Sequence, residues 1–182
     1  MNQSAKQMHD AAWVERAVVT LVEKILGQFK SFEEIAIVGV RTRGAVLATR
    51  IADEVSRRTG VSPALGAVDI TLYRDDLHST RRIPAVRGTD IPFNIENTKI
   101  LLVDDVLYTG RTIRAALDEL VDFGRPEWIK LAVLIDRECR ELPIRADFVA
   151  QQVDAPPEQF VRLHLKETDG KDEVVIIQEK TV

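Results

Sequence analysis

The sequence predicts an α/β fold in which helices flank one mostly parallel central sheet. Two observations support this prediction. Short apolar runs, typical of strands buried on both faces of a parallel sheet, recur along the 182-residue chain. Segments with helical spacing of apolar residues separate these runs, and such alternation is typical of a parallel sheet. There is no internal repeat or second-domain boundary, so we expect a single domain over residues 1–182.

The first half of the chain supplies two helices and two strands. Apolar residues at helical spacing predict a helix over Ala11–Phe29, and Asp10 before it is a suitable N-cap. The run IAIVGV predicts a buried strand at Ile35–Val40. A second helix is expected over Ala45–Arg58, and LGAVDITLY predicts a second strand over Leu65–Tyr73.

The segment from residue 74 to about residue 97 has no strand or helix pattern. It reads RDDLHSTRRIPAVRGTDIPFNIEN, with two prolines and four arginines. A connection of this length inside a compact domain is usually functional. We therefore expect a lid loop or a flexible hairpin here.

The second half continues the alternation. Strands are predicted at Thr98–Val103, Trp128–Ile135 and Asp147–Val153, with a helix over Thr112–Gly124. The tail QFVRLHLKETDGKDEVVIIQE predicts two strands around a turn at Asp169-Gly170.

Composition narrows the class of protein. The formal net charge of -4 and the sequence pI of about 5.5 do not indicate a nucleic-acid binder, although a local basic face remains compatible with them. The single cysteine, Cys139, excludes an intramolecular disulfide and suits a reducing compartment. There is no signal-peptide pattern and no apolar run long enough to span a membrane, so a cytoplasmic location is expected.

The stretch ILLVDDVLYTGRT, residues 100–112, carries the clearest chemical signal. A loop between a strand and a helix start offers backbone N–H groups and the positive end of the helix dipole, which together bind anions. Gly110 allows close approach of a ligand, and Thr109 and Thr112 add hydroxyl groups. This loop therefore predicts a phosphate site.

The adjacent Asp104 and Asp105 require a different partner, because carboxylates repel phosphate. Vicinal sugar hydroxyls or a hard cation such as Mg²⁺ would satisfy the pair, so a sugar phosphate fits both halves of the motif. The alternatives are a solvated strand end with an N-cap role, or the phosphoacceptor of a receiver domain, which has no place for Thr-Gly-Arg-Thr. Neither GxxxxGK[ST] nor GxGxxG occurs, so nucleotide P-loops and dinucleotide folds lack support.

The stretch ILLVDDVLYTGRT resembles the phosphoribosyl pyrophosphate (PRPP) motif of type I phosphoribosyltransferases. DITLYRDD, DRECRELPIRADFV and VGVRTRGAVLA further resemble the PyrR family, the pyrimidine operon regulators that double as uracil phosphoribosyltransferases. The similarity runs from about residue 10 to the C-terminus. It implies the type I phosphoribosyltransferase fold, with a flexible lid loop at about 74–97 and a small C-terminal β-hairpin or hood.

The resemblance also implies roles for individual residues. Asp104, Asp105 and Arg74 would be catalytic, with Arg74 in the lid meeting pyrophosphate. Asp136 and Arg137 would lie at the base, and Arg140 and Arg145 are candidate RNA contacts. The PRPP or nucleotide site would comprise Thr42, Arg43, Asp104, Asp105, Val106, Leu107, Tyr108, Thr109, Gly110, Arg111 and Thr112. The pyrophosphate loop would comprise Arg41, Thr42, Arg43 and Gly44.

The implied reaction joins uracil to the phosphoribosyl group of PRPP and yields UMP and pyrophosphate. Mg²⁺ would be bound through the substrate, with Asp104 and Asp105 as its candidate protein ligands. Family members also respond to UMP or UTP, bind the leader mRNA of the pyrimidine (pyr) operon to promote transcription attenuation, and form homodimers or higher homo-oligomers. The nearly neutral first helix and the acidic chain favour, as an alternative, an enzyme without RNA binding. A phosphoribosyltransferase for another base, such as a purine or orotate, is the third hypothesis, against which DITLYRDD argues.

Overall fold

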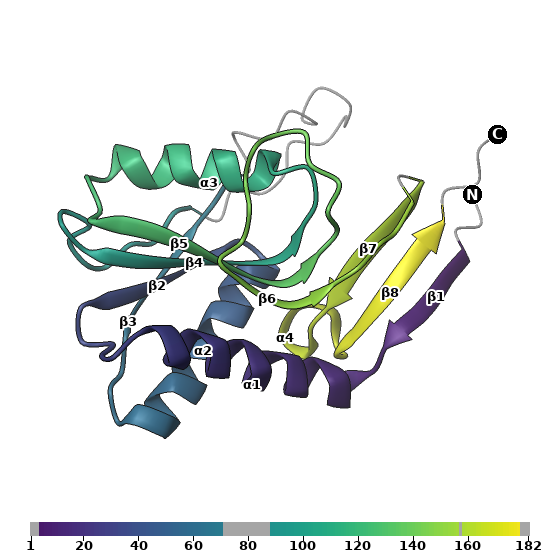
Figure 1. The fold of residues 1–182 in the computed structure, drawn as a ribbon, viewed down its shortest axis with the longest axis horizontal. Helices are drawn as coiled ribbons and strands as arrows, with labels where there is room; N and C mark the ends of the chain where they lie inside the picture. Colours follow the sequence, from purple (N-terminus) through teal and green to yellow (C-terminus); the bar gives the residue numbers. More distant parts are fainter. Residues whose placement is uncertain (1–3, 71–87, 157, 179–182) are drawn as a thin grey trace.

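The centre of the molecule is a five-stranded sheet whose hydrogen-bonded neighbours are all parallel, in the order β3-β2-β4-β5-β6 (Figure 1). It is seen in a computed structural model that describes residues 4–70, 88–156 and 158–178. The strands are β2 (Ile35–Val40), β3 (Ala64–Val68), β4 (Lys99–Leu107), β5 (Trp128–Asp136) and β6 (Phe148–Gln152). The predicted α/β class is confirmed.

Helices cover both faces of this sheet (Figure 1). Helices α1 (Ala11–Gln28) and α2 (Arg43–Thr59) share one apolar cluster with Ile37 and Leu101. Helix α3 (Arg111–Asp122) packs in a second apolar cluster on the other face. This cluster includes Val38 and Leu102, the residues that follow Ile37 and Leu101 in the chain. Successive residues of a strand point to opposite faces, so each apolar run serves both clusters.

The helix ends follow the sequence signals closely. The side chain of Asp10 accepts a hydrogen bond from the Trp13 N–H at 2.9 Å, which confirms the predicted N-cap of α1. Helix α2 begins two residues earlier than predicted, at Arg43, and ends before Gly60, whose φ of 75° suits glycine. The start of α2 therefore lies within the predicted pyrophosphate loop.

A second, antiparallel sheet in the order β1-β8-β7 lies beside the first (Figure 1). Its strands are β1 (Ser4–His9), β7 (Gln159–His164) and β8 (Glu173–Gln178), and the short helix α4 (Lys166–Asp169) connects the last two. The two predicted tail strands are confirmed. Strand β1 was not predicted, because SAKQMH is polar and becomes a strand only by pairing with β8.

Two predicted strand ends were wrong. Strand β4 continues through both aspartates to Leu107, where a loop had been expected after Val103, because the neighbouring β5 offers pairing partners as far as Asp136. Strand β3 ends at Val68 instead of Tyr73. Of the predicted extension, residues 71–73 lie outside the described residues.

The last part of the predicted lid range, residues 88–97, contacts the domain. Ile95 is buried, and Asp90 pairs with Ala67 through two backbone hydrogen bonds of 2.8 Å. The Thr89 hydroxyl accepts the Asp69 N–H at 3.1 Å. These contacts attach the segment beside the carboxyl end of β3.

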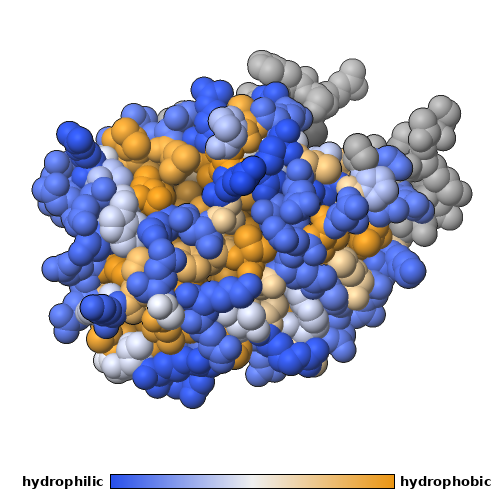
Figure 2. All heavy atoms as spheres, in the orientation of Figure 1, coloured by the Kyte–Doolittle hydropathy of each residue, from blue (hydrophilic) through white to orange (hydrophobic). Residues whose placement is uncertain are grey.

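On the face viewed in Figure 2, hydrophilic and hydrophobic residues are interspersed at the surface. None of the helices in the described part of the chain is long and apolar enough to cross a membrane.

Candidate active site

The candidate site lies where the order of the parallel sheet reverses. From β2 the chain proceeds to β3 on one side, and then to β4 on the other side of β2. The loops that follow β2 and β4 therefore diverge and leave a crevice at the carboxyl ends of the strands, the usual ligand position in such sheets. These loops are residues 41–42 and 108–110.

The loop after β4 leads directly into helix α3. Gly110 is the N-cap residue of α3, with a φ of 92°, and no side chain caps the helix there. The Thr109 hydroxyl is 3.4 Å from the Arg111 N–H, which is at the long end of hydrogen bonding. A helix start of this kind presents backbone donors that can bind an anion, and the predicted phosphate site lies here.

Residues 138–146 wrap over this loop and hold it in place. The N–H groups of Glu141 and Leu142 both donate to the Thr109 carbonyl, at 3.0 and 3.1 Å. A Cβ atom on Gly110 would lie 3.4 Å from the side chains of Leu142 and Ile144. The predicted phosphate loop is thus supported from the β5–β6 connection, which sequence analysis did not anticipate.

Asp104 and Asp105 lie at the carboxyl end of β4. Asp104 is buried and accepts the Asp105 N–H at 2.9 Å, and Asp105 accepts the Val106 N–H at 2.9 Å. Gly44 packs closely on this strand end: a Cβ at Gly44 would lie 2.6 Å from the Val103 carbonyl and 3.2 Å from Oδ1 of Asp104. Only glycine permits this approach, which brings the start of α2 against the aspartates.

The loop after β2 carries the predicted pyrophosphate residues. The Arg41 N–H donates to the Val68 carbonyl at 2.9 Å, and the Arg41–Thr42 peptide bond is cis. Thr42 is the N-cap residue of α2 without a side-chain cap bond. The Arg43 guanidinium donates to Asp169 at 3.0 and 2.7 Å, a partner in the distant C-terminal segment.

The predicted base residues lie at the end of β5 and are buried. Asp136 accepts the Glu138 N–H at 2.9 Å and a hydrogen bond from the Arg140 guanidinium. The Arg137 guanidinium stacks on the Tyr108 ring at 4.0 Å. Their backbone groups are also engaged, since the Arg137 N–H donates to Leu107 at 3.0 Å and the Asp136 carbonyl accepts from Val153 at 2.8 Å.

The two candidate RNA residues differ sharply in their environment. Arg140 is half-buried and donates to the Ile144 carbonyl at 2.9 Å, to the Tyr108 carbonyl at 2.6 Å and to Asp136. Arg145 is exposed. Arg140 thus joins the phosphate loop to the end of β5, whereas Arg145 is open to a partner.

The structure brings together most of the predicted site at one edge of the sheet. Arg74 lies outside the described residues. Among the residues that are described, no group of three or more His, Cys, Asp or Glu side chains could hold a metal ion. Sequence reasoning missed Asp169, for which no sequence signal exists because it is 126 residues from Arg43.

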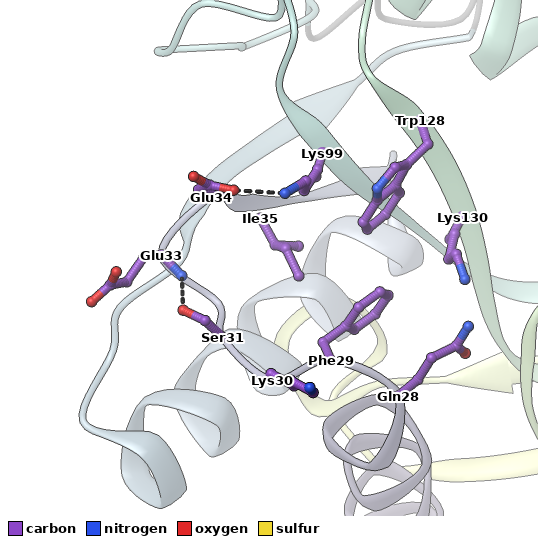
Figure 3. Close-up of a pocket in the computed structure, with 10 residues that line it drawn as sticks. All are labelled: Gln28, Phe29, Lys30, Ser31, Glu33, Glu34, Ile35, Lys99, Trp128 and Lys130. Atoms are coloured by element: carbon purple, nitrogen blue, oxygen red, sulfur yellow. Dashed lines mark hydrogen bonds and ion pairs between the residues drawn. The ribbon is translucent and has the colours of Figure 1, made fainter.

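A cavity of about 550 Å³ lies at the opposite edge of the sheet (Figure 3). Its labelled residues Ile35, Lys99 and Trp128 start strands β2, β4 and β5, and Lys99 pairs with Glu34 at 2.6 Å. Ligands of open parallel sheets bind at the carboxyl ends of the strands, so this cavity is distinct from the candidate site.

Comparison with known proteins agrees with this geometry. Residues 4–168 match the phosphoribosyl transferase domain family. The chain is 50% identical over 159 residues to a protein of Deinococcus radiodurans named bifunctional protein PyrR, covering 87% of each chain. It is 49% identical to the protein of that name from Chloroflexus aurantiacus, covering 95% of each chain.

Solved structures show the same fold at low identity. A hypoxanthine phosphoribosyltransferase from Trypanosoma cruzi matches with a TM-score of 0.72 and 17% identity, over 95% of each chain. A hypoxanthine-guanine phosphoribosyltransferase from Bacillus anthracis matches with a TM-score of 0.68, over 97% of this chain and 99% of its own. Fold and site together define the class as a type I phosphoribosyltransferase. Within that class, the chain belongs to the PyrR family.

Proposed function

We propose that the protein transfers the phosphoribosyl group of PRPP to uracil, forming UMP and pyrophosphate, and that it also regulates pyrimidine genes through RNA. The observation that carries the enzymatic proposal is the position of Asp104 and Asp105. They lie at the reversal of strand order, directly before a loop that opens the uncapped start of α3 and against the start of α2. A sugar with a phosphate on either side fits this arrangement.

The proposed roles follow the three segments of the site. The segment from Val106 through Leu107, Tyr108, Thr109, Gly110 and Arg111 to Thr112, which joins the end of β4 to the start of α3, holds the 5′-phosphate on backbone N–H groups. Asp104 and Asp105 accept hydrogen bonds from the ribose hydroxyls. The loop Arg41, Thr42, Arg43 and Gly44 receives pyrophosphate, with Arg74 joining from the segment outside the described residues.

In the reaction, uracil forms a bond to C1 of the ribose while the bond from C1 to a pyrophosphate oxygen breaks. Positive charge grows on the ribose and negative charge on the leaving group. Donors and charges held in place before the reaction stabilise both, so positioning and electrostatics supply most of the rate enhancement. The protein needs no covalent nucleophile for this displacement.

Mg²⁺ fits the chemistry of these residues as a companion of the substrate. Its ligands are hard oxygens, and Asp104 and Asp105 are carboxylates of the proposed PRPP site. When bound, the ion neutralises pyrophosphate charge.

The proposed base site is the end of β5. Asp136 and Arg137 are buried there beside Tyr108 of the phosphate loop. Because their backbone groups already bond to Leu107 and Val153, we propose that they set the position of the base site as well as forming its wall.

The second function rests on the relatives, which are named bifunctional. We propose that UMP or UTP binding at the site regulates binding to pyr leader mRNA. Among the two predicted RNA residues, exposed Arg145 is the better candidate, because the donors of Arg140 are engaged internally. The alternative of an enzyme without RNA binding is favoured by the formal net charge of -4.

The enzymatic proposal is tested by steady-state kinetics of Asp105→Asn with uracil, PRPP and Mg²⁺. Loss of the charge that faces the ribose should lower kcat/KM about a hundredfold. The matched control is Asp118→Asn on the exposed side of α3, where the carboxylate is 3.5 Å from Arg114. Equal activity of Asp105→Asn and wild type would contradict the assignment.

A further inference from the structure

The C-terminal segment reaches the candidate site through one ion pair. Arg43, the first residue of α2, donates through Nε to Oδ2 of Asp169 at 3.0 Å and through Nη2 to Oδ1 at 2.7 Å. Two parallel hydrogen bonds between a guanidinium and a carboxylate fix the orientation of both groups. The side chains are 30% and 20% exposed, so water screens this pair only in part.

Asp169 is itself held rigidly. Its Oδ2 atom also accepts the Leu165 N–H at 2.9 Å and the Thr168 hydroxyl at 2.7 Å. The Arg43 guanidinium, helped by these donors, holds the pKa of Asp169 well below its ordinary value. The carboxylate is therefore a fixed negative charge at neutral pH.

Arg43 is also influenced by the charge of Asp105 on β4. The hydrogen bonds that Arg43 donates to Asp169, together with the negative charges of Asp169 and Asp105, raise the pKa of Arg43. The next residue is Gly44, whose backbone packs on the end of β4 beside Asp104. The start of α2 thus contacts the C-terminal turn through Arg43 and the end of β4 through Gly44.

A second arginine of α2 attaches the same turn farther from the site. Arg50 donates to Glu167 at 2.9 and 2.7 Å and to Asp172 at 2.8 Å through both terminal nitrogens. The turn is therefore anchored to α2 independently of Asp169. Arg50 therefore holds the turn on α2, whereas Asp169 orients Arg43.

We propose that Asp169 is a positioning residue for PRPP, which acts by orienting Arg43 and the loop of residues 41–44 toward the pyrophosphate group. Asp169 then supports the active site from the C-terminal turn of residues 165–172, although it contributes no atom to the substrate. The inference rests on the proposed function, in that Arg43 is taken to lie at the pyrophosphate position. It extends that function because Asp169 lies in the connection between two strands of the antiparallel sheet, so PRPP affinity depends on this second sheet as well.

The test is the kinetic comparison of Asp169→Asn with Asp172→Asn, a matched change in the same turn that breaks a pair to Arg50 instead. Because a misplaced positioning group weakens substrate alignment strongly, Asp169→Asn should raise KM for PRPP about tenfold. KM for uracil should change less than about twofold, because the base lies on β5. Asp172→Asn should lower the melting temperature and leave KM for PRPP unchanged. Asp169→Glu, which retains the charge, should recover part of the PRPP affinity.

A double-mutant comparison identifies the route of the effect. In an Arg43→Ala background, adding Asp169→Asn should cause no further rise in KM for PRPP, because Asp169 acts through Arg43. Additive effects in the two backgrounds would overturn the proposal. So would an Asp169→Asn enzyme whose only change is a melting temperature lowered like that of Asp172→Asn.

Calorimetric binding of PRPP with Mg²⁺ separates this inference from the choice of base. If wild type binds PRPP but does not convert uracil, a tenfold weaker PRPP affinity of Asp169→Asn still supports the positioning role. In that case the proposed function fails alone. Unchanged PRPP affinity in Asp169→Asn, with normal uracil turnover by wild type, overturns the inference alone. A wild type that does not bind PRPP overturns both.

Discussion

At the scale of single residues, Arg140 shows how the same side chain can have two interpretations. In the sequence, Arg140 is a cation in a segment similar to that of an RNA-binding family, which predicts an RNA contact. In the structure its guanidinium joins Asp136, the Tyr108 carbonyl and the Ile144 carbonyl, with only 18% of its side chain exposed. The hydrogen bonds of Arg140 connect the predicted phosphate loop with the proposed base site, so its main role is to stabilise the protein.

We therefore predict that Arg140→Met destabilises the protein by about 3 kcal/mol, because it leaves the buried Asp136 carboxylate without its cation. Chemical denaturation measures the change. Arg145→Ala is the control, since an exposed side chain should alter the free energy of unfolding by less than about 0.5 kcal/mol. An equally small effect of both variants would show that Arg140 is a surface charge after all.

At the scale of elements, the junction between β2 and α2 depends on close backbone packing. A Cβ atom on Gly39 would lie 2.4 Å from Cα of Ala45 and 2.4 Å from the Gly44 carbonyl. No rotation of a side chain relieves contacts with backbone atoms. The start of α2, and with it the loop of residues 41–44, lies against β2 only because residue 39 is glycine.

Gly39→Ala should accordingly cost about 3 kcal/mol of stability through overpacking. Gly27→Ala is its counterpart, in an exposed part of helix α1 where nothing lies within 4 Å of the added carbon. That variant should gain about 0.5 kcal/mol, as alanine is the better helix residue. Thermal unfolding of the two variants should move in opposite directions, and a shift in the same direction would contradict the packing argument.

The turn at residues 165–172 gives the second element-scale prediction, which concerns acid. The ion pair with Arg43 lowers the pKa of Asp169, and that with Arg50 lowers those of Glu167 and Asp172. A carboxyl group with a depressed pKa contributes its full stability above the unfolded-state value and loses it as pH falls through the folded value. For Asp169 that unfolded-state value is 3.8.

The contribution of these carboxyl groups to the unfolding free energy should thus be steady between about pH 7 and pH 5, and fall below about pH 4. Asp169→Asn should be less stable at neutral pH and should show a shallower fall in acid. Denaturation at a series of pH values provides the measurement. Parallel curves for wild type and variant would mean that the Arg43 pair contributes nothing to stability.

At the scale of the whole molecule, sequence predicted the parallel sheet and its helices, because buried apolar runs and helical spacing are local patterns. It did not predict β1 or the end of β4, which depend on pairing with distant strands. Nor could it predict the partners of Arg43 and Arg140. Their residue types suggest ligand contacts, whereas tertiary packing supplies Asp169 to Arg43 and the Tyr108 carbonyl to Arg140.

The overall charge bears on the regulatory proposal. The formal net charge is -4, and of the predicted RNA contacts only Arg145 is exposed. We expect pyr leader RNA to bind more tightly with UMP present, and to show a shallow salt dependence because few phosphates are neutralised. A filter-binding titration at two salt concentrations, with scrambled RNA as control, measures both quantities. Equal affinity for the scrambled RNA would favour the enzyme without RNA binding.

Phosphoribosyl transfer to uracil is tested most directly by a competition among bases. The protein, PRPP and Mg²⁺ are incubated with equal amounts of uracil, hypoxanthine, adenine and orotate, and the nucleotides are identified by mass spectrometry. UMP is the expected main product, with one pyrophosphate released per UMP and about a hundredfold slower product formation by Asp105→Asn. A purine nucleotide or orotidine monophosphate as the main product would contradict the assignment of uracil, and the absence of any nucleotide would contradict phosphoribosyl transfer itself.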